Sequence, residues 1–194
     1  MSILLIAGSP SERSRSAALL EAVGQRLSGR GLDVERLRIR DLSPQALLLA
    51  DVAHRSVSQA IDQVDRARAI VVGTPVYKAA YSGFLKVFLD LLPQSALKGK
   101  LVLPLATGGS PHHMLALDYA LRPVLQSLGP RHILPGIYAS DAQITVTPEG
   151  AYHVGDEIGV RLDEAAGNLR TALERPAPAG SFEPIDFARV RCSV

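Results

Sequence analysis

The sequence ILLIAGSPSERSRS, residues 3–16, decides how the chain folds. Its first five residues are apolar and the run stops at Gly8, which is typical of a short strand buried on both faces of a parallel sheet. A polar segment follows, and a helix is predicted from about Ser14. The amino end of a helix has free N–H groups and a positive dipole, so this turn is a candidate anion site.

The same turn carries side chains that suit a phosphate group. Hydroxyl and forked guanidinium groups donate the hydrogen bonds that a phosphate monoester accepts. Both kinds are concentrated here, at Ser9, Ser11, Arg13, Ser14, Arg15 and Ser16. A helix cap beside a solvated, serine-rich loop is an equal alternative when the turn is considered alone.

The composition excludes several classes of protein. With 194 residues, 47% of them hydrophobic, the chain can form one domain with a sizeable core. The net charge is only +2 and no basic stripe alternates with aromatic residues, so we expect no nucleic-acid partner. No apolar run approaches the roughly 20 residues of a membrane span, and no signal peptide fits before residue 3, so we expect a cytoplasmic protein without a membrane partner. A single cysteine, Cys192, excludes an internal disulfide.

Strands and helices are predicted to alternate. Strands are expected at residues 3–7, 33–39, 69–73, 100–106 and 131–138. Helices are expected at residues 14–28, within 41–51, and at 56–68, 81–92, 112–128 and 157–174, with an excursion or hairpin at 140–154. This alternation predicts an α/β fold with a parallel sheet. We expect one domain over residues 1–175 and a loose tail over 176–194.

Three prolines predict irregularities. Pro104 cannot donate to the ladder of the strand at 100–106, so a local irregularity is expected there. Pro135 interrupts the strand at 131–138 and places it at a sheet edge. Pro123 lacks the N–H that would bond to the carbonyl of Tyr119, so a kink or one-residue bulge is expected around Tyr119.

Three loops are expected at one edge of the sheet, because the carboxyl ends of parallel strands meet there. Residues 9–16 offer phosphate donors, and residues 74–78 carry Tyr77 on a rigid turn. Residues 107–110 contain a glycine pair that lets the backbone approach a flat ligand. A phosphate at one end and a planar ring at the other describe flavin mononucleotide (FMN). The G-x-G-x-x-G dinucleotide fingerprint is missing from these loops.

Several segments resemble a known family. AGSP with SRS at 14–16, TPVYKAAYSGFLK at 74–86 and LPLATGG at 103–109 resemble the NAD(P)H-dependent FMN reductases. More narrowly, they resemble the reductase of two-component alkanesulfonate monooxygenase systems. The resemblance covers about residues 1–140. It implies a flavodoxin-like three-layer sandwich, with a five-stranded parallel sheet in the order 2-1-3-4-5, and a homotetramer.

The resemblance also implies an activity and site residues. FMN would be reduced by NADPH or NADH, two alternatives that stay open, and released to a partner flavin-dependent monooxygenase in sulfonate sulfur assimilation. The phosphate would be held by Ser9, Ser14, Arg15 and Ser16, with Arg13 replacing an arginine that relatives carry at the position of Ser11. The ring would be bordered by Pro75, Val76 and Tyr77, and its polar edge would face Thr107, Gly108 and Gly109. Tyr119 matches a tyrosine at a π-type bulge on the oligomer interface.

The expected chemistry needs no catalytic side chain. Hydride passes directly between the two cofactors, and backbone N–H groups of Gly108 and Gly109 would stabilise the charge that develops on the ring. His112 and His113 have no third partner nearby in the sequence, so no metal site is expected.

Two alternative functions stay open. One is a quinone or azo reductase that retains FMN. The other is an electron carrier like flavodoxin, which a net charge of +2 disfavours because such carriers are acidic for docking.

Overall fold

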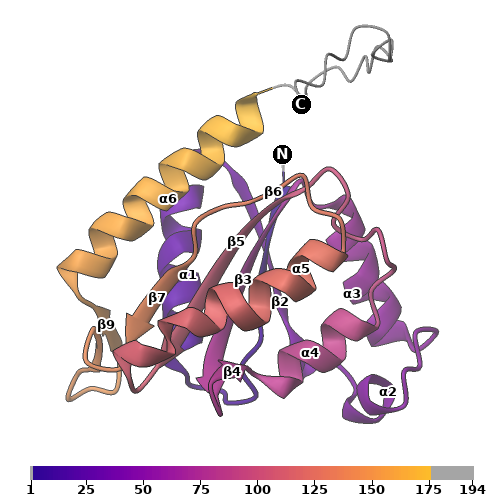
Figure 1. The fold of residues 1–194 in the computed structure, drawn as a ribbon, viewed down its shortest axis with the longest axis horizontal. Coiled ribbons are helices and arrows are strands. Elements are labelled where there is room, and N and C mark those ends of the chain that lie inside the picture. The colour runs from indigo at the N-terminus through magenta and orange to yellow at the C-terminus, as the bar shows by residue number, and fades with distance from the viewer. Residues whose placement is uncertain (1, 176–194) are drawn as a thin grey trace, which may run out of the picture.

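A parallel sheet forms the middle layer of the computed structural model, which describes residues 2–175 (Figure 1). Its strands are β1 (Ser2–Ala7), β2 (Asp33–Arg38), β3 (Ala69–Tyr77), β5 (Leu101–Gly108), β6 (His132–Ile133) and β7 (Ile137–Ser140). They lie in the order β2-β1-β3-β5-β6, with β7 also paired to β5. Because β6 and β7 follow each other along one edge, the predicted order 2-1-3-4-5 is confirmed.

Helices cover both faces of the sheet (Figure 1). On one face lie α1 (Arg15–Ser28) and α6 (Asp156–Glu174), and on the other lie α3 (Arg55–Arg66), α4 (Gly83–Asp90) and α5 (Arg122–Ser127). The short helices η1 (Ile39–Asp41) and α2 (Pro44–Leu48) precede α3. Alternate residues of β1 enter the two cores, with Ile3 and Leu5 beside α1 and Leu4 and Ile6 on the opposite face. This double burial explains the unbroken apolar run of β1.

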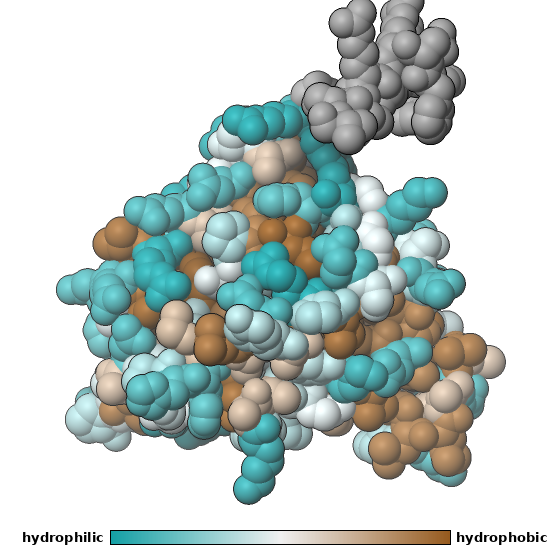
Figure 2. Space-filling model, in the orientation of Figure 1, coloured by the Kyte–Doolittle hydropathy of each residue, from teal (hydrophilic) through white to brown (hydrophobic). Residues whose placement is uncertain are grey.

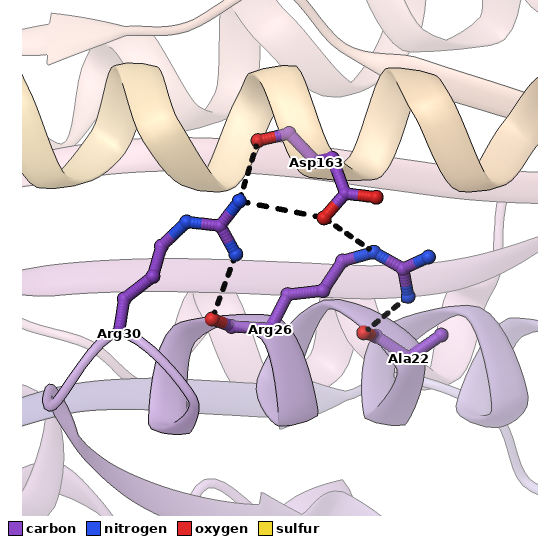
Figure 3. A network of polar contacts seen from close by, with 4 residues as sticks. All are labelled: Ala22, Arg26, Arg30 and Asp163. Carbon is purple, nitrogen blue, oxygen red and sulfur yellow. Dashed lines mark hydrogen bonds and ion pairs between the residues drawn. The ribbon is translucent and has the colours of Figure 1, made fainter.

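An ionic network joins α1 to α6 (Figure 3). Asp163 Oδ1 lies 3.2 Å from Arg26 Nε and 3.4 Å from Arg30 Nη2. Arg30 Nη2 also donates to the backbone carbonyl of Asp163 at 3.3 Å. Desolvation raises the pKa of Asp163, but the two guanidinium groups outweigh it and the pKa is lowered from its ordinary value. Two helices distant in sequence are thereby fastened on the same face of the sheet.

The irregularity predicted at Pro104 occurs in the neighbouring strand. β5 continues through Pro104, which is in register with Val72 of β3. On the other side, Val102 pairs with Ile133 and Leu105 pairs with Ile137, so two residues of β5 face three residues of the edge strand. The edge strand therefore bulges where Pro104 cannot donate a hydrogen bond. Its interruption around Pro135 was predicted.

The helix predicted at 112–128 is instead three segments. A 3₁₀ turn, η2 (Pro111–Leu115), leads into a π-helix, η3 (Leu117–Leu121), which continues as α5. The N–H of Arg122 donates to the carbonyl of Leu117, five residues back. The bulge predicted around Tyr119 is confirmed, and the first turn of the predicted helix is 3₁₀ instead of α-helical.

The strand predicted at 69–73 is longer than expected. β3 continues to Tyr77, so most of the predicted loop at 74–78 is strand. It turns back into β4 (Ala80–Tyr81) through Lys78 and Ala79, both with positive φ, at 50° and 62°. The predicted excursion at 140–154 contains a hairpin of β8 (Ile144–Val146) and β9 (Tyr152–Val154).

Two expectations concern the ends of the chain and the membrane. The predicted tail at 176–194 lies outside the described residues. Among the helices of residues 2–175, none is long and apolar enough to cross a bilayer. The cytoplasmic location stays a prediction.

Lys100 fastens the end of α3 to the start of β5. Its side chain is 9% exposed, and its Nζ donates to the carbonyls of Asp65 and Ala67 at 2.6 and 2.8 Å. These carbonyls lie at the carboxyl end of the helix, where a cation is favourable.

We expect Lys100→Met to lower the free energy of unfolding by about 1–3 kcal/mol, because two carbonyls lose a charged donor while the apolar stem keeps its packing. Urea denaturation at neutral pH measures the loss. The exposed Lys98 provides a matched control, and Lys98→Met should stay within about 0.5 kcal/mol of the unaltered protein. Equal losses in both variants would contradict this role.

Lys100 also makes stability depend on pH. Burial lowers the pKa of its ammonium group below the ordinary value of 10.5, against an opposing effect of Asp65. The unfolded chain therefore binds more protons at this position between the two pKa values, and stability rises as pH increases toward 10.5. Urea denaturation at increasing pH measures this effect, and the unaltered protein should gain stability relative to Lys100→Met as pH rises toward 10.5.

Candidate functional site

A cleft of about 350 Å³ opens at the carboxyl edge of the sheet. All three predicted loops border it, together with the segment that contains β8 and β9. Of the predicted binding residues, those that line it are Arg13, Ser14, Arg15, Ser16, Pro75, Val76, Tyr77, Thr107, Gly108 and Gly109. Ser11, Asp141 and Tyr152 also line it, whereas Ser9 does not.

A wider groove, of about 590 Å³, lies beside η1 and α3. Its lining includes Asp41, Gln59, Asp62 and Gln63, and it contains neither a glycine pair nor an aromatic side chain. None of the three loops from the carboxyl edge reaches it. The smaller cleft is therefore the better candidate site, because polar donors and a glycine pair line it together.

The first loop delivers the amino end of α1 to the cleft. Ser14 caps this helix, since its Oγ accepts from the N–H of Ala17 at 3.1 Å and lies 3.3 Å from Ser16 Oγ. Ser9 is only 3% exposed, and its Oγ accepts from the N–H of Ser11 at 3.2 Å. Ser9 therefore supports the bend of the loop and does not line the cleft, whereas the sequence had predicted that it holds the phosphate.

A buried hydrogen-bond network joins the first loop to the second. Ser82 Oγ donates to the carbonyl of Gly8 at 2.5 Å and accepts from the N–H of Leu85 at 3.1 Å, which caps α4. The N–H of Ser82 donates to Thr74 Oγ1 at 3.0 Å. Thr74 and Ser82 are at most 1% exposed. Sequence reasoning did not single out Ser82, although a serine before a helical Gly83 is a capping signal.

The third loop requires glycine at position 108. A Cβ on Gly108 would lie 2.7 Å from Tyr138 Oη and 3.3 Å from Val76 Cβ. Tyr138 Oη donates to the carbonyl of Ser110 at 2.5 Å, so the tyrosine is held against the loop. Burial raises the pKa of Tyr138, and the nearby Asp141 raises it further. The wall of the cleft is therefore formed by backbone here.

The segment between β7 and β9 closes the cleft beside the first loop. Arg15 Nε donates to the carbonyl of Ile144 at 2.9 Å, and Arg15 Nη1 lies 3.6 Å from Asp141 Oδ2. Sequence reasoning missed Asp141 and Tyr152. Asp141 follows the fifth strand, so the rule that placed the other loops at this edge could have included it. The hairpin of β8 and β9 brings Tyr152 to the cleft, and no sequence pattern predicts this placement.

Other predicted residues lie outside the cleft. Tyr119 is 79% exposed on the π-helix η3. His112 and His113 lie on η2, and within residues 2–175 no three His, Cys, Asp or Glu side chains are grouped closely enough to hold a metal ion.

Comparison with known proteins connects this chain to one family. The family described as "NADPH-dependent FMN reductase" matches residues 1–145. The protein described as "FMN reductase (NADPH)" from Escherichia coli strain K12 is 42% identical over 179 residues, covering 90% of this chain and 91% of its own. A protein with the same description from Pseudomonas putida strain KT2440 is 49% identical over 181 residues, covering 92% and 91%.

Solved structures agree with these sequence matches. The apo crystal structure of NADH:FMN oxidoreductase (EMOB) superposes with a TM-score of 0.81 at 42% identity, covering 90% of this chain and 91% of that one. A flavodoxin from the domain Archaea superposes with a TM-score of 0.61 at 16% identity, a likeness of fold alone. With a flavodoxin-like sheet, a family match over residues 1–145 and two relatives alike over nine-tenths of its length, the chain belongs to the NADPH-dependent FMN reductase family.

Proposed function

We propose that this FMN reductase binds FMN in the cleft at the carboxyl edge, reduces it with NADPH or NADH, and releases it to a partner flavin-dependent monooxygenase. The observation that carries the proposal is the convergence of the serine- and arginine-rich loop with the glycine pair around one cleft of about 350 Å³. The narrower context, sulfonate sulfur assimilation, follows from the resemblance of residues 74–86 and 103–109 to the alkanesulfonate-linked reductases.

The donor set of the first loop fits a phosphate. The amino end of α1, with Ser14 and Ser16, lies at a cleft that Arg13 and Arg15 also line. A phosphate there would meet hydroxyl donors, guanidinium groups and the positive end of a helix dipole. Ser9 contributes indirectly, by holding the bend of the loop.

The opposite end of the cleft suits a planar ring. Pro75 and Val76 provide a rigid, apolar border, and Tyr77, 49% exposed, stands at the rim. When bound there, FMN accepts a hydride from the nicotinamide cofactor. The loops of the chain would position the ring, and the backbone N–H of Gly109 would donate toward the ring edge where negative charge develops. The backbone of Gly108 pairs with β7.

Either nicotinamide cofactor is compatible with the relatives, because the Escherichia coli relative is described with NADPH and the EMOB structure with NADH, both at 42% identity. Measuring kcat/KM with each cofactor, at saturating FMN, separates the two alternatives.

An oligomer is also proposed, with η2 and η3 at its interface. Met114 and Leu115 are 56% and 53% exposed and lie just before Tyr119, so three large side chains face outward on consecutive helical turns. Apolar side chains also gather at the surface over α2, where Leu48 and Leu49 are 75% and 71% exposed (Figure 2). Apolar surface of this kind is typical of a contact between subunits. A homotetramer would bury this apolar surface between its subunits.

The purified protein should be nearly colourless and should oxidise NADPH or NADH only when FMN is added, with sequential kinetics. Flavin absorbance after purification and initial rates over a grid of both substrates measure these properties. A yellow preparation with stoichiometric flavin and ping-pong kinetics toward quinones would instead support the alternative, a quinone or azo reductase that retains FMN. Failure to oxidise either nicotinamide in the presence of FMN would contradict the proposed FMN reductase activity.

Gly108→Ala should lower kcat/KM for FMN by at least about tenfold, because the added Cβ displaces the loop that positions the ring. Gly167→Ala on α6 is the matched control, since a Cβ there meets nothing within 4 Å. Adding Tyr138→Phe to Gly108→Ala removes the hydroxyl that the Cβ meets and should restore part of the activity. Equal activity of the two glycine variants would show that this wall does not position FMN.

Tyr119→Ala should shift the protein toward smaller assemblies, because it removes the most exposed large side chain of η3. Size-exclusion chromatography with light scattering measures the mass. Val160, 60% exposed on α6, offers a control on another surface, and Val160→Ala should keep the mass of the unaltered protein. An unchanged mass in both variants would remove η3 from the interface.

A further inference from the structure

The cleft contains a carboxylate where an anion is expected to bind. Among residues 2–175, the charged side chains that line it are Arg13, Arg15 and Asp141. The side chain of Asp141 is 46% exposed and that of Arg15 is 36% exposed, so both are accessible from the cleft. One of the two positive charges is thus paired with a negative charge before any ligand arrives.

Asp141 is held in this position by its backbone. Its N–H donates to the carbonyl of Gly108 at 3.0 Å, which joins it to the glycine wall of the cleft. The turn that follows is closed by the N–H of Gln143 donating to the carbonyl of Ser140 at 3.0 Å. Ser140 in turn donates from its N–H to Gln143 Oε1 at 2.9 Å. The carboxylate therefore remains beside the cleft.

Asp141 affects Arg15 through its negative charge and does not orient the guanidinium group. The distance of 3.6 Å between Arg15 Nη1 and Asp141 Oδ2 is too long for a good hydrogen bond. The guanidinium is oriented instead by its Nε, which donates to the carbonyl of Ile144 at 2.9 Å. Removing the charge of Asp141 should consequently leave Arg15 in place.

We propose that Asp141 determines how weakly the protein holds the phosphate of FMN, and so keeps the flavin exchangeable. This role rests on the proposed function, because it assumes that the phosphate lies beside Arg15. The carboxylate neutralises part of the charge of Arg15 and repels a phosphate that carries close to two negative charges at neutral pH. A flavin that must leave after each turnover requires such a limit on affinity, whereas a retained flavin does not.

The test uses Asp141→Asn, which keeps the shape of the side chain and removes its charge. Dissociation constants for FMN and for riboflavin, which has the same ring and no phosphate, are measured by flavin fluorescence at low and high salt. We expect FMN to bind about fivefold more tightly or better at low salt, with a smaller gain at high salt, because partly exposed charges are screened. Riboflavin should bind as it does to the unaltered protein.

Two control variants separate charge from structure. Asp141→Glu keeps the charge and should keep the affinity for FMN. Asp90→Asn removes a carboxylate from the exposed pair with Lys86 on α4 and should change neither affinity. Thermal unfolding of each variant verifies that the fold is retained.

Each remaining outcome overturns a specific claim. If FMN binds Asp141→Asn no more tightly, or more weakly, the carboxylate does not limit affinity. If FMN and riboflavin change together, Asp141 acts on the ring end or on the hairpin, and the charge mechanism is wrong. If neither the unaltered protein nor Asp141→Asn binds FMN better than it binds riboflavin, the phosphate is not held in the cleft. That result contradicts the proposed function itself and is distinct from a failure of the role of Asp141.

Discussion

The burial of β1, β3 and β5 on both faces is the constraint on which the rest of the structure depends. A strand covered on both sides can take only apolar residues, so Ile3 to Ile6 fill two separate cores. Parallel strands of this kind need helical crossovers, which bring their carboxyl ends to one edge. The polar residues of the chain's three central loops therefore meet at that edge, although up to a hundred residues separate them.

The first and second loops must also be held in a fixed position relative to each other, and Ser82 holds them. One hydroxyl group closes the first loop at Gly8 and caps α4, while the backbone of the same residue holds Thr74 in the second loop. These side chains are buried, so losing one partner leaves the others without a hydrogen bond in the interior of the protein. The mutual position of the first and second loops at the cleft is thus set by a residue outside the cleft lining.

The sequence predicted the features that depend on local pattern. The alternation of strands and helices follows from the apolar runs, and the order of the strands was implied by the family resemblance. The π-helix around Tyr119 follows from Pro123, which has no N–H to donate to the carbonyl of Tyr119. Features that depend on distant partners were missed. β3 extends beyond Gly73 because Thr74 and Pro75 pair with β5 and Val76 pairs with β4, and Asp141 reaches the cleft because its turn is bonded to Gly108.

The tight turn at Lys78 and Ala79 limits which residues can be accepted at these two positions. Both residues adopt left-handed backbone conformations, which cost a residue with a β-carbon roughly 1–2 kcal/mol and cost glycine almost nothing. Asparagine followed by glycine is the pair that such a turn prefers. A gene library randomised at these two codons and screened only for heat resistance should enrich that pair, whereas a screen for turnover would reveal what the lysine contributes.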